Sequence, residues 1–232
     1  MQTRFRVEAL VPAAGAGLRI GLDRPKQFLI VAGRPVLSWT LHRLLACGVA
    51  RCTVAVPVAL LGEAGETILE DPRMQWVAGG ETRQDSVAAS LAVASGPADD
   101  LILVHDGARP AVAEEDVRAT IEAAARHDGA VLGRFVGDTL KRLEDGRIVE
   151  TIGRSGLFHA ETPQVFRRGL FERALEESRR DGFQGTDEAS LVERLAGAHI
   201  RSVLARSPNP KLTHAADLEL IEALLSRVGG FH

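Results

Sequence analysis

The sequence predicts one α/β domain over residues 1–232, with a mostly parallel sheet covered by helices on both faces. Short apolar runs alternate with segments of helical period through the first two thirds of the chain, as they do where crossover helices connect parallel strands. The chain is 45% hydrophobic and 25% charged over 232 residues, which suits a single buried core. A linker rich in proline or glycine, which would mark a second domain, is absent from the sequence.

The expected elements follow in chain order. Apolar runs of strand length predict strands at Val7–Val11, Cys52–Val56, Met74–Val77, Leu101–His105, Ala130–Phe135 and Ile200–Leu204. Apolar residues at helical spacing predict helices at Val36–Leu45, Leu60–Glu70, Ser86–Ala94, Glu114–Arg126, Leu170–Arg180, Asp187–Leu195 and Asp217–Leu225. Asp85 is the expected cap of the helix that begins at Ser86.

A β-hairpin interrupts this alternation at about residues 136–154. Two extended segments, Thr139–Glu144 and Arg147–Ile152, flank Asp145-Gly146. A two-residue Asp-Gly connection is a strong hairpin signal, because both turn positions need positive φ. The hairpin carries few apolar residues and would be unstable alone. Two arrangements stay open: an arm that leans on a second copy of the chain, or an edge hairpin of the same sheet.

Charge and composition exclude several classes of protein. The net charge of −3 provides no general basic surface for nucleic acid, so an anionic ligand must meet a local cluster of Lys and Arg. The apolar stretches are too short to span a bilayer, and the first seven residues lack the apolar core of a signal peptide. We therefore expect a cytoplasmic protein without a membrane partner. Cys47 and Cys52 match no metal or redox spacing and are expected to be free thiols.

The first chemical signal is a loop of small residues after the first strand. It reads Pro12-Ala13-Ala14-Gly15-Ala16-Gly17-Leu18-Arg19 and is followed by Pro25-Lys26-Gln27. Small side chains let backbone N–H groups approach a phosphate, and Arg19 and Lys26 add positive charge. The loop lacks the Gly-Lys-Ser/Thr ending of a Walker A motif, and Ile20 stands where the dinucleotide fingerprint has its third glycine. The loop therefore favours a nucleotide phosphate site of another kind.

The second signal is the end of the strand at Leu101–His105, which runs into Asp106-Gly107-Ala108-Arg109-Pro110. Charged groups at the carboxyl end of a parallel strand lie where ligands bind in open α/β sheets. Asp106 could hold a divalent cation through a carboxylate oxygen, and Arg109 could grip a phosphate with two hydrogen bonds. The alternative is a local ion pair between Asp106 and Arg109 that shapes a turn. His105 is more typical of a satisfied interior histidine than of a ligand.

The remaining signals are weaker when taken singly. Gly79–Ser86 joins a short strand to a helix, and its backbone could read a flat base or could form an ordinary connection with a capped helix. Arg154, Thr162 and Lys211 are dispersed, and each alone is typical of a surface group or a cap.

Taken together and in order, these segments resemble one family, the 2-C-methyl-D-erythritol 4-phosphate cytidylyltransferases of the non-mevalonate isoprenoid pathway. The resemblance covers nearly the whole chain. The matching segments are Pro12–Arg19, Pro25-Lys26-Gln27, Gly79–Ser86, Val104–Pro110, Asp138-Thr139-Leu140-Lys141, Thr162-Pro163-Gln164 and Thr186-Asp187-Glu188-Ala189. Glu81 stands where some members have Asp, and Gly107 stands where some have Ala.

The resemblance implies a fold like that of the nucleotide-sugar transferases, of Rossmann type, and a homodimer formed through the hairpin arm. It implies that Arg19 and Lys26 are catalytic and contact the phosphates of CTP. The nucleotide would be surrounded by Ala13, Ala14, Gly15, Gly17, Gly80, Glu81 and Ser86. The acceptor, a small polyol phosphate, would be held by Asp106, Arg109, Thr162 and Lys211, with Thr139 and Arg154 reaching in from the partner's arm.

These residue types suit the implied reaction, the transfer of CMP from CTP to methylerythritol phosphate. The nucleophile is a phosphate oxygen that is already ionised, so no general base is needed, and cations must offset the repulsion between two polyanions. Mg²⁺ is the expected cofactor, bound mostly through the CTP phosphates. One alternative is a cytidylyltransferase for another polyol phosphate such as ribitol 5-phosphate. The other is a catalytically silent nucleotide-binding module.

Overall fold

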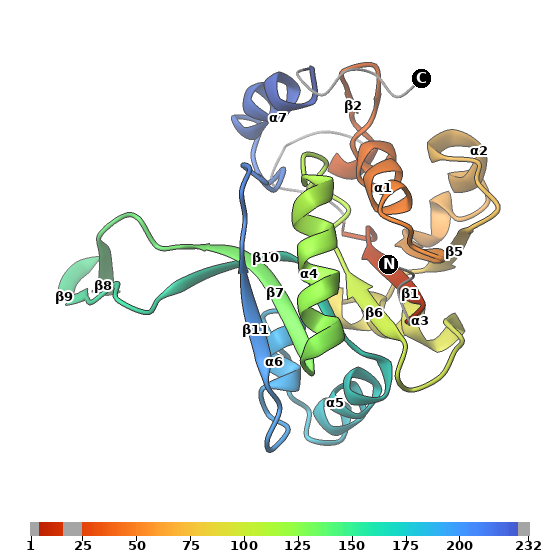
Figure 1. Cartoon of the computed structure of the whole chain (residues 1–232). Helices are drawn as coiled ribbons and strands as arrows, with labels where there is room; N and C mark the ends of the chain where they lie inside the picture. The colour runs from red at the N-terminus through yellow and green to blue at the C-terminus, as the bar shows by residue number, and fades with distance from the viewer. Residues whose placement is uncertain (1–4, 16–24, 227–232) are drawn as a thin grey trace.

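A seven-stranded sheet forms the centre of the described part of the chain, residues 5–15 and 25–226 of this computed structural model (Figure 1). Its order is β11-β7-β10-β6-β1-β4-β5. The strands are β1 (Val7–Pro12), β4 (Arg51–Val56), β5 (Met74–Ala78), β6 (Leu101–Val104), β7 (Gly129–Phe135), β10 (Phe158–Arg167) and β11 (Ile200–Leu204). Only β10 pairs antiparallel within this described sheet, so the prediction of a mostly parallel sheet is confirmed.

Helices cover both faces of the sheet (Figure 1). They are α1 (Val36–Ala46), α2 (Ala64–Ile68), α3 (Arg83–Val93), α4 (Glu114–Arg126), α5 (Arg168–Arg180), α6 (Glu188–Val192) and α7 (Asp217–Ser226). Successive side chains of a strand point to opposite faces. Ala9 and Val11 of β1 accordingly join a core cluster with α1 and α4, while Leu10 joins a second cluster with α3 and α5. Both faces of β1 are therefore buried, which explains its continuous apolar run.

A third apolar cluster lies beside the carboxyl end of β6. It joins α7 and α1 to the short strand β2 (Ile30–Val31), which follows η2 (Lys26–Phe28) and pairs with β3 (Arg34–Pro35). Leu212 is fully buried in this cluster, and its backbone N–H donates to the Ala108 carbonyl over 2.8 Å. The cluster thereby holds the segment around Lys211 against the loop that follows β6.

Three helices differ from their predicted bounds by three residues or more. The segment predicted as one helix at Leu60–Glu70 starts at the last residue of a short 3-10 turn, Val58–Leu60, and is helical only in α2; Gly62 and Gly65 weaken a continuous helix there. Helix α3 starts at Arg83, because Thr82 and not Asp85 is its cap, and the two side chains form a reciprocal capping box. Helix α6 is capped by Asp187 as expected for a start there, but it ends at Val192.

Strand β10 was not predicted at all. It lies between β6 and β7 and pairs antiparallel with both. Its middle contains Glu161, Thr162, Pro163 and Gln164, which are polar or lack a backbone donor and so do not read as a central strand. The register on β7 shifts between Ala160 and Gln164, and this irregularity accommodates the proline.

The predicted hairpin is confirmed as β8 (Leu140–Glu144) and β9 (Arg147–Ile152). Asp145 and Gly146 both have positive φ, 47° and 79°, as the turn requires. The hairpin is a separate two-stranded sheet, and Figure 1 shows it projecting away from the body. It is therefore an arm, and the alternative of an edge hairpin on the main sheet is excluded.

The two cysteines and the lengths of the helices complete the description of the fold. Cys47 and Cys52 are free thiols, as predicted, and the structure shows that both are buried. Burial raises the pKa of both thiols to about 12, so neither is a thiolate at neutral pH. None of the helices within residues 5–15 and 25–226 has the length and apolar character needed to cross a membrane.

Candidate active site

A cleft of about 700 Å³ opens at the carboxyl ends of β1 and β6. From β1 the chain moves to β4 and β5 on one side, and then returns to β6 on the other side of β1. Such a reversal leaves a crevice between the loops that follow the two strands, where ligands bind in this class of sheet. The cleft is lined by Pro12, Ala13, Ala14, Gly15, Lys26, Gln27, Gly80, Glu81, Thr82, Arg83, Ser86, Asp106, Gly107, Ala108, Lys211 and Thr213.

The small-residue loop after β1 forms one wall of the cleft. Its described part ends at Gly15; the predicted site residues Gly17 and Arg19 lie outside the described residues. The buried Gln27 side chain donates to the carbonyls of Ala13 and Gly15 and so ties this loop to η2, which carries Lys26. Lys26 therefore lines the cleft next to the loop.

The loop between β5 and α3 packs directly on the first loop. A methyl group at Gly79 would overlap the Ala14 side chain, so only glycine allows this approach. Ser86 is buried, and its hydroxyl accepts from the Gly80 N–H over 3.2 Å and donates to the Thr82 carbonyl over 3.0 Å. In this structure Ser86 thus orders the loop. Glu81 is exposed at the mouth of the cleft.

Asp106 lies at the opposite wall with cations on several sides. Its Oδ1 accepts from Arg83 Nε at 2.9 Å, and its Oδ2 lies 2.8 Å from Lys211 Nζ and 3.5 Å from Arg109 Nε. Burial alone would raise the pKa of Asp106, but the charges of Arg83 and Lys211 hold this pKa well below its ordinary value. Asp106 is therefore ionised throughout the physiological pH range.

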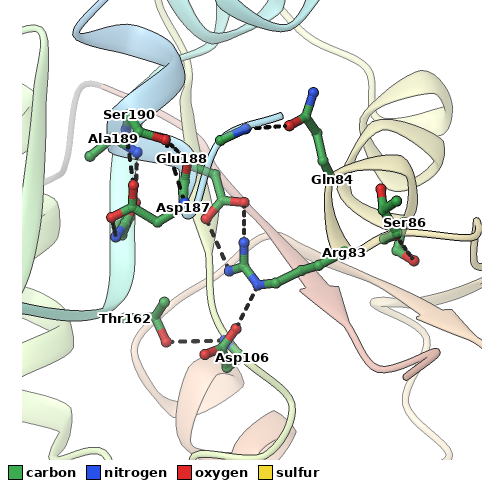
Figure 2. A network of polar contacts seen from close by, with 12 residues as sticks. Arg83, Gln84, Ser86, Asp106, Thr162, Asp187, Glu188, Ala189 and Ser190 are labelled. Atoms are coloured by element: carbon green, nitrogen blue, oxygen red, sulfur yellow. Dashed lines mark hydrogen bonds and ion pairs between the residues drawn. The ribbon is translucent and has the colours of Figure 1, made fainter. Parts of the chain in front are cut away.

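Arg83 links this carboxylate to a second buried acid, Glu188 at the start of α6. Figure 2 shows the Arg83 side chain lying between Glu188 and Asp106. Its Nη1 and Nη2 donate to the two Glu188 oxygens over 2.6 and 3.0 Å. Burial would lower the pKa of Arg83, but the two carboxylates raise it above its ordinary value.

The remaining predicted acceptor residues of the body meet around Asp106. Thr162 on β10 is buried, and its hydroxyl accepts from the Asp106 N–H over 3.1 Å (Figure 2). Arg109 donates to the carbonyl of Asn209 over 2.6 Å, and the Asn209 side chain donates to the Thr162 carbonyl over 2.8 Å. Asn209 thus orders the segment that leads to Lys211, a role that its place in an irregular Asn-Pro stretch did not indicate.

His105 is fully buried, as the interior alternative proposed. Its Nε2 lies 3.2 Å from the Arg109 carbonyl oxygen. Burial lowers the pKa of His105 to about 4, so the ring is neutral at physiological pH. It helps to shape the turn from Asp106 to Arg109 and faces the interior.

The two predicted arm residues do not meet the cleft of their own chain. Thr139 and Arg154 are exposed at the base of the arm, and the guanidinium of Arg154 donates to the Gly137 carbonyl. Neither residue belongs to the lining of the cleft.

A metal held by protein side chains alone has no evident place in the described residues. They contain no group of three or more His, Cys, Asp or Glu side chains that could hold an ion. Asp106, the predicted metal ligand, turns both oxygens toward cations.

The fold and the site define a nucleotide-dependent transferase for anionic substrates. The sheet presents a small-residue loop with Lys26 on one side of a crevice and a carboxylate ringed by Arg83, Arg109 and Lys211 on the other. The family model of 2-C-methyl-D-erythritol 4-phosphate cytidylyltransferase (IspD) matches residues 7–227. The chain belongs to this family.

Individual relatives agree. The 2-C-methyl-D-erythritol 4-phosphate cytidylyltransferase of Geotalea uraniireducens is 40% identical over 97% of this chain and 98% of its own length. The enzyme of the same name from Aeromonas hydrophila is 44% identical over 91% of this chain and 86% of its own. The crystal structure of the Thermus thermophilus enzyme of that name is 36% identical, with a TM-score of 0.80 over 96% of this chain and 100% of its own.

The reaction follows from this membership. The chain is a cytidylyltransferase that converts CTP and 2-C-methyl-D-erythritol 4-phosphate to 4-diphosphocytidyl-2-C-methyl-D-erythritol, in the non-mevalonate pathway to isoprenoid precursors. The ordered motifs predicted this function. Arg83 and Glu188 lie in two of the matching segments, but no role was predicted for either; their opposite charges in matching segments were the available signal.

Proposed function

We propose that the cleft divides into a nucleotide half and an acceptor half. The nucleotide half comprises Ala13, Ala14, Gly15, Lys26, Gly80, Glu81 and Ser86, together with Gly17 and Arg19 outside the described residues. The acceptor half comprises Asp106 and Lys211 of the cleft lining, with Arg109 and Thr162, which contact Asp106 from outside that lining. The observation that carries this division is the placement of Lys26 and Lys211 in the lining of one cleft between neighbouring strand ends.

In this arrangement a phosphate oxygen of methylerythritol phosphate attacks the α-phosphorus of CTP. A new phosphorus–oxygen bond forms as the bond to the β-phosphate breaks, and pyrophosphate leaves. Lys26 and Arg19 stabilise the negative charge that develops on the phosphoryl oxygens and the leaving group. Asp106 accepts hydrogen bonds from the polyol hydroxyls, and Lys211 and Arg109 attract the acceptor phosphate. The two cationic sets bring two polyanions together in a protein whose net charge is −3.

A divalent cation, with Mg²⁺ the expected ion, accompanies the nucleotide. When bound, it neutralises charge on the CTP phosphates and helps to orient them for displacement. The cleft suits an ion that arrives with the nucleotide, because the buried Asp106 already serves three cations and Glu81 is exposed.

Pyrophosphate release tests this proposal directly. We expect release when CTP, Mg²⁺ and methylerythritol phosphate are all present, and loss of release when EDTA removes the metal. Replacing methylerythritol phosphate with ribitol 5-phosphate, or CTP with another nucleotide, should lower kcat/KM by roughly tenfold or more, because polar groups of the site would be left unpaired. Full turnover in EDTA would contradict the metal role, and a CTP-induced rise in Tm without release would indicate a silent binding module.

We further propose that two copies of the chain exchange their arms. Apolar side chains on the arm, such as Leu143 and Ile148, are 61% and 65% exposed, although an isolated two-stranded hairpin is marginally stable. A second copy would cover them. The exchange would also bring Thr139 and Arg154, which are outside the cleft of their own chain, to the acceptor half of the partner's cleft.

Mixing two inactive variants tests the exchange. We expect Lys26→Ala and Arg154→Ala to be defective separately, because one lacks a catalytic cation in the body and the other lacks an arm residue. Co-expressed, half of the dimers formed at random contain one of each, and one of their two sites is intact, so activity should return to about a quarter of wild type. No recovery, or a monomer by light scattering at micromolar concentration, would contradict the exchange.

A further inference from the structure

Glu188 is a buried carboxylate for which the reaction has supplied no role. It is 2% exposed, starts the five-residue helix α6, and is not part of the cleft lining. A carboxylate is costly to bury unless a cation and hydrogen bonds satisfy it. For Glu188 the cation is Arg83, whose side chain reaches the carboxylate from the start of α3.

Each of the three guanidinium nitrogens of Arg83 donates to a carboxylate, even though Arg83 lines the cleft. Both of its terminal nitrogens donate to Glu188, at 2.6 and 3.0 Å, and its Nε donates to Asp106 at 2.9 Å (Figure 2). Because a guanidinium is planar and rigid, fixing one edge on Glu188 fixes the direction of the Nε–H bond. Arg83 therefore links two carboxylates and fixes their relative positions. Its role differs from that of a cation whose partner is a substrate phosphate.

The ion pair between Glu188 and Arg83 also sets the net charge next to Asp106 in the acceptor half. Asp106 faces three cations, whereas Glu188 contacts only Arg83 among the described cations. An ionised Glu188 neutralises the positive charge of Arg83 from the side that faces away from Asp106. Asp106 Oδ2 then remains available to Lys211 at 2.8 Å and to Arg109 at 3.5 Å.

The surrounding contacts hold Glu188 in place. The Gln164 side chain donates to Asp187 over 2.8 Å and accepts from the Ala189 N–H over 2.9 Å. The Gln84 side chain accepts from the Gly185 N–H over 3.0 Å. Residues on either side of Glu188 are thus tied both to β10, which carries Thr162, and to α3, which carries Arg83 (Figure 2).

We propose that Glu188 is a positioning residue for the acceptor phosphate and polyol: it acts through Arg83 to hold Asp106 and, through Asp106, Lys211. This inference rests on the assignment of Asp106 and Lys211 to the acceptor half. It predicts a loss confined to one substrate, because the contacts run from Glu188 through Arg83 to Asp106 and Lys211.

The test is the steady-state kinetics of Glu188→Gln. An amide presents one NH₂ group to the Arg83 fork, so the paired hydrogen bonds are lost at nearly constant volume. We expect the KM for methylerythritol phosphate to rise about tenfold, which is the scale of a lost charged hydrogen bond, while the KM for CTP changes less than about twofold. Equal changes in both KM values would overturn the inference.

Glu8→Gln is the matched control, because Glu8 is also a buried glutamate paired with an arginine, Arg6 at 2.9 Å, and does not line the cleft. It should lower Tm as Glu188→Gln does, and yet leave the KM for methylerythritol phosphate within about twofold of wild type. A similar rise in that KM would show that lost stability alone explains the effect.

A double-mutant cycle identifies the route. If Glu188 acts through Arg83, then adding Glu188→Gln to Arg83→Gln should raise the KM for methylerythritol phosphate no further. Additive effects of the two substitutions would contradict a route through Arg83. Asp106→Asn in the same assay distinguishes the assignment of the acceptor half from the role of Glu188. An unchanged acceptor KM in Asp106→Asn would remove the acceptor assignment, whereas a change there but none in Glu188→Gln would remove only the role of Glu188.

Discussion

Lys26→Ala is expected to lower kcat by roughly 10²-fold or more, the scale of a lost transition-state donor. Lys26 lines the cleft beside Ala13 and Gly15, and the neighbouring Gln27 ties the loop and η2 together. In the proposed division of the cleft, the ammonium group is assigned to the leaving pyrophosphate, where negative charge develops. Because Lys26 is only partly buried, the folded state should lose little stability.

The measurement is single-turnover pyrophosphate release, with Tm as the check on folding. Arg118→Ala serves as the control, since Arg118 is a cation on α4 that pairs with Glu114 at 3.1 Å and does not line the cleft. It should keep wild-type turnover. Near-normal turnover in Lys26→Ala, and in Arg19→Ala beside it, would contradict the role of the small-residue loop.

Asp106→Asn is expected to lower kcat/KM for methylerythritol phosphate by about 10²- to 10³-fold and to destabilise the fold by about 2–4 kcal/mol. The amide has no charge, and whichever way it is turned, its NH₂ group faces either Arg83 or the pair Lys211 and Arg109. Cations that converge on one carboxylate would then repel one another. The stability estimate stays below that of a fully buried pair, because Arg83 and Lys211 are partly exposed.

Glu8→Gln provides the comparison, because Glu8 is also a buried acid paired with an arginine, Arg6 at 2.9 Å. It lies near the start of β1, whereas the cleft lies at the carboxyl end of that strand. Urea unfolding and acceptor kinetics should show lost stability in both variants and lost kcat/KM only in Asp106→Asn. Wild-type kinetics in Asp106→Asn would show that the carboxylate merely shapes a turn.

The fold was predictable wherever a local pattern carried the information. The helix at Glu114–Arg126 was predicted to the residue, since three acids begin it and its apolar residues keep helical spacing. The arm was predicted from Asp145-Gly146, because few other dipeptides adopt positive φ twice. Strand β10 was not predicted because Glu161, Thr162 and Gln164 are polar. They are acceptable inside the sheet because residues distant in sequence form hydrogen bonds with them.

The candidate site divides in the same way. Lys26 and the loop at Ala13–Gly15 could be found from the sequence, because they follow a recognisable strand directly. Arg83 and Glu188 were visible only as members of matching segments, since they are 105 residues apart. Thr139 and Arg154 illustrate the opposite case, because the resemblance names them and the single chain leaves them outside its own cleft.

The sequence by itself therefore determined the α/β class, the strand-end positions of the chemical groups, the arm, and through the ordered motifs the family. Those properties depend on local periodicity, turn chemistry and residue type. Only the tertiary structure decided the place of β10 between β6 and β7 and the convergence of Arg83, Arg109 and Lys211 on Asp106. The physical reason is that a buried polar residue is acceptable only with its partners, and those partners come from distant segments brought together by burial of the apolar core.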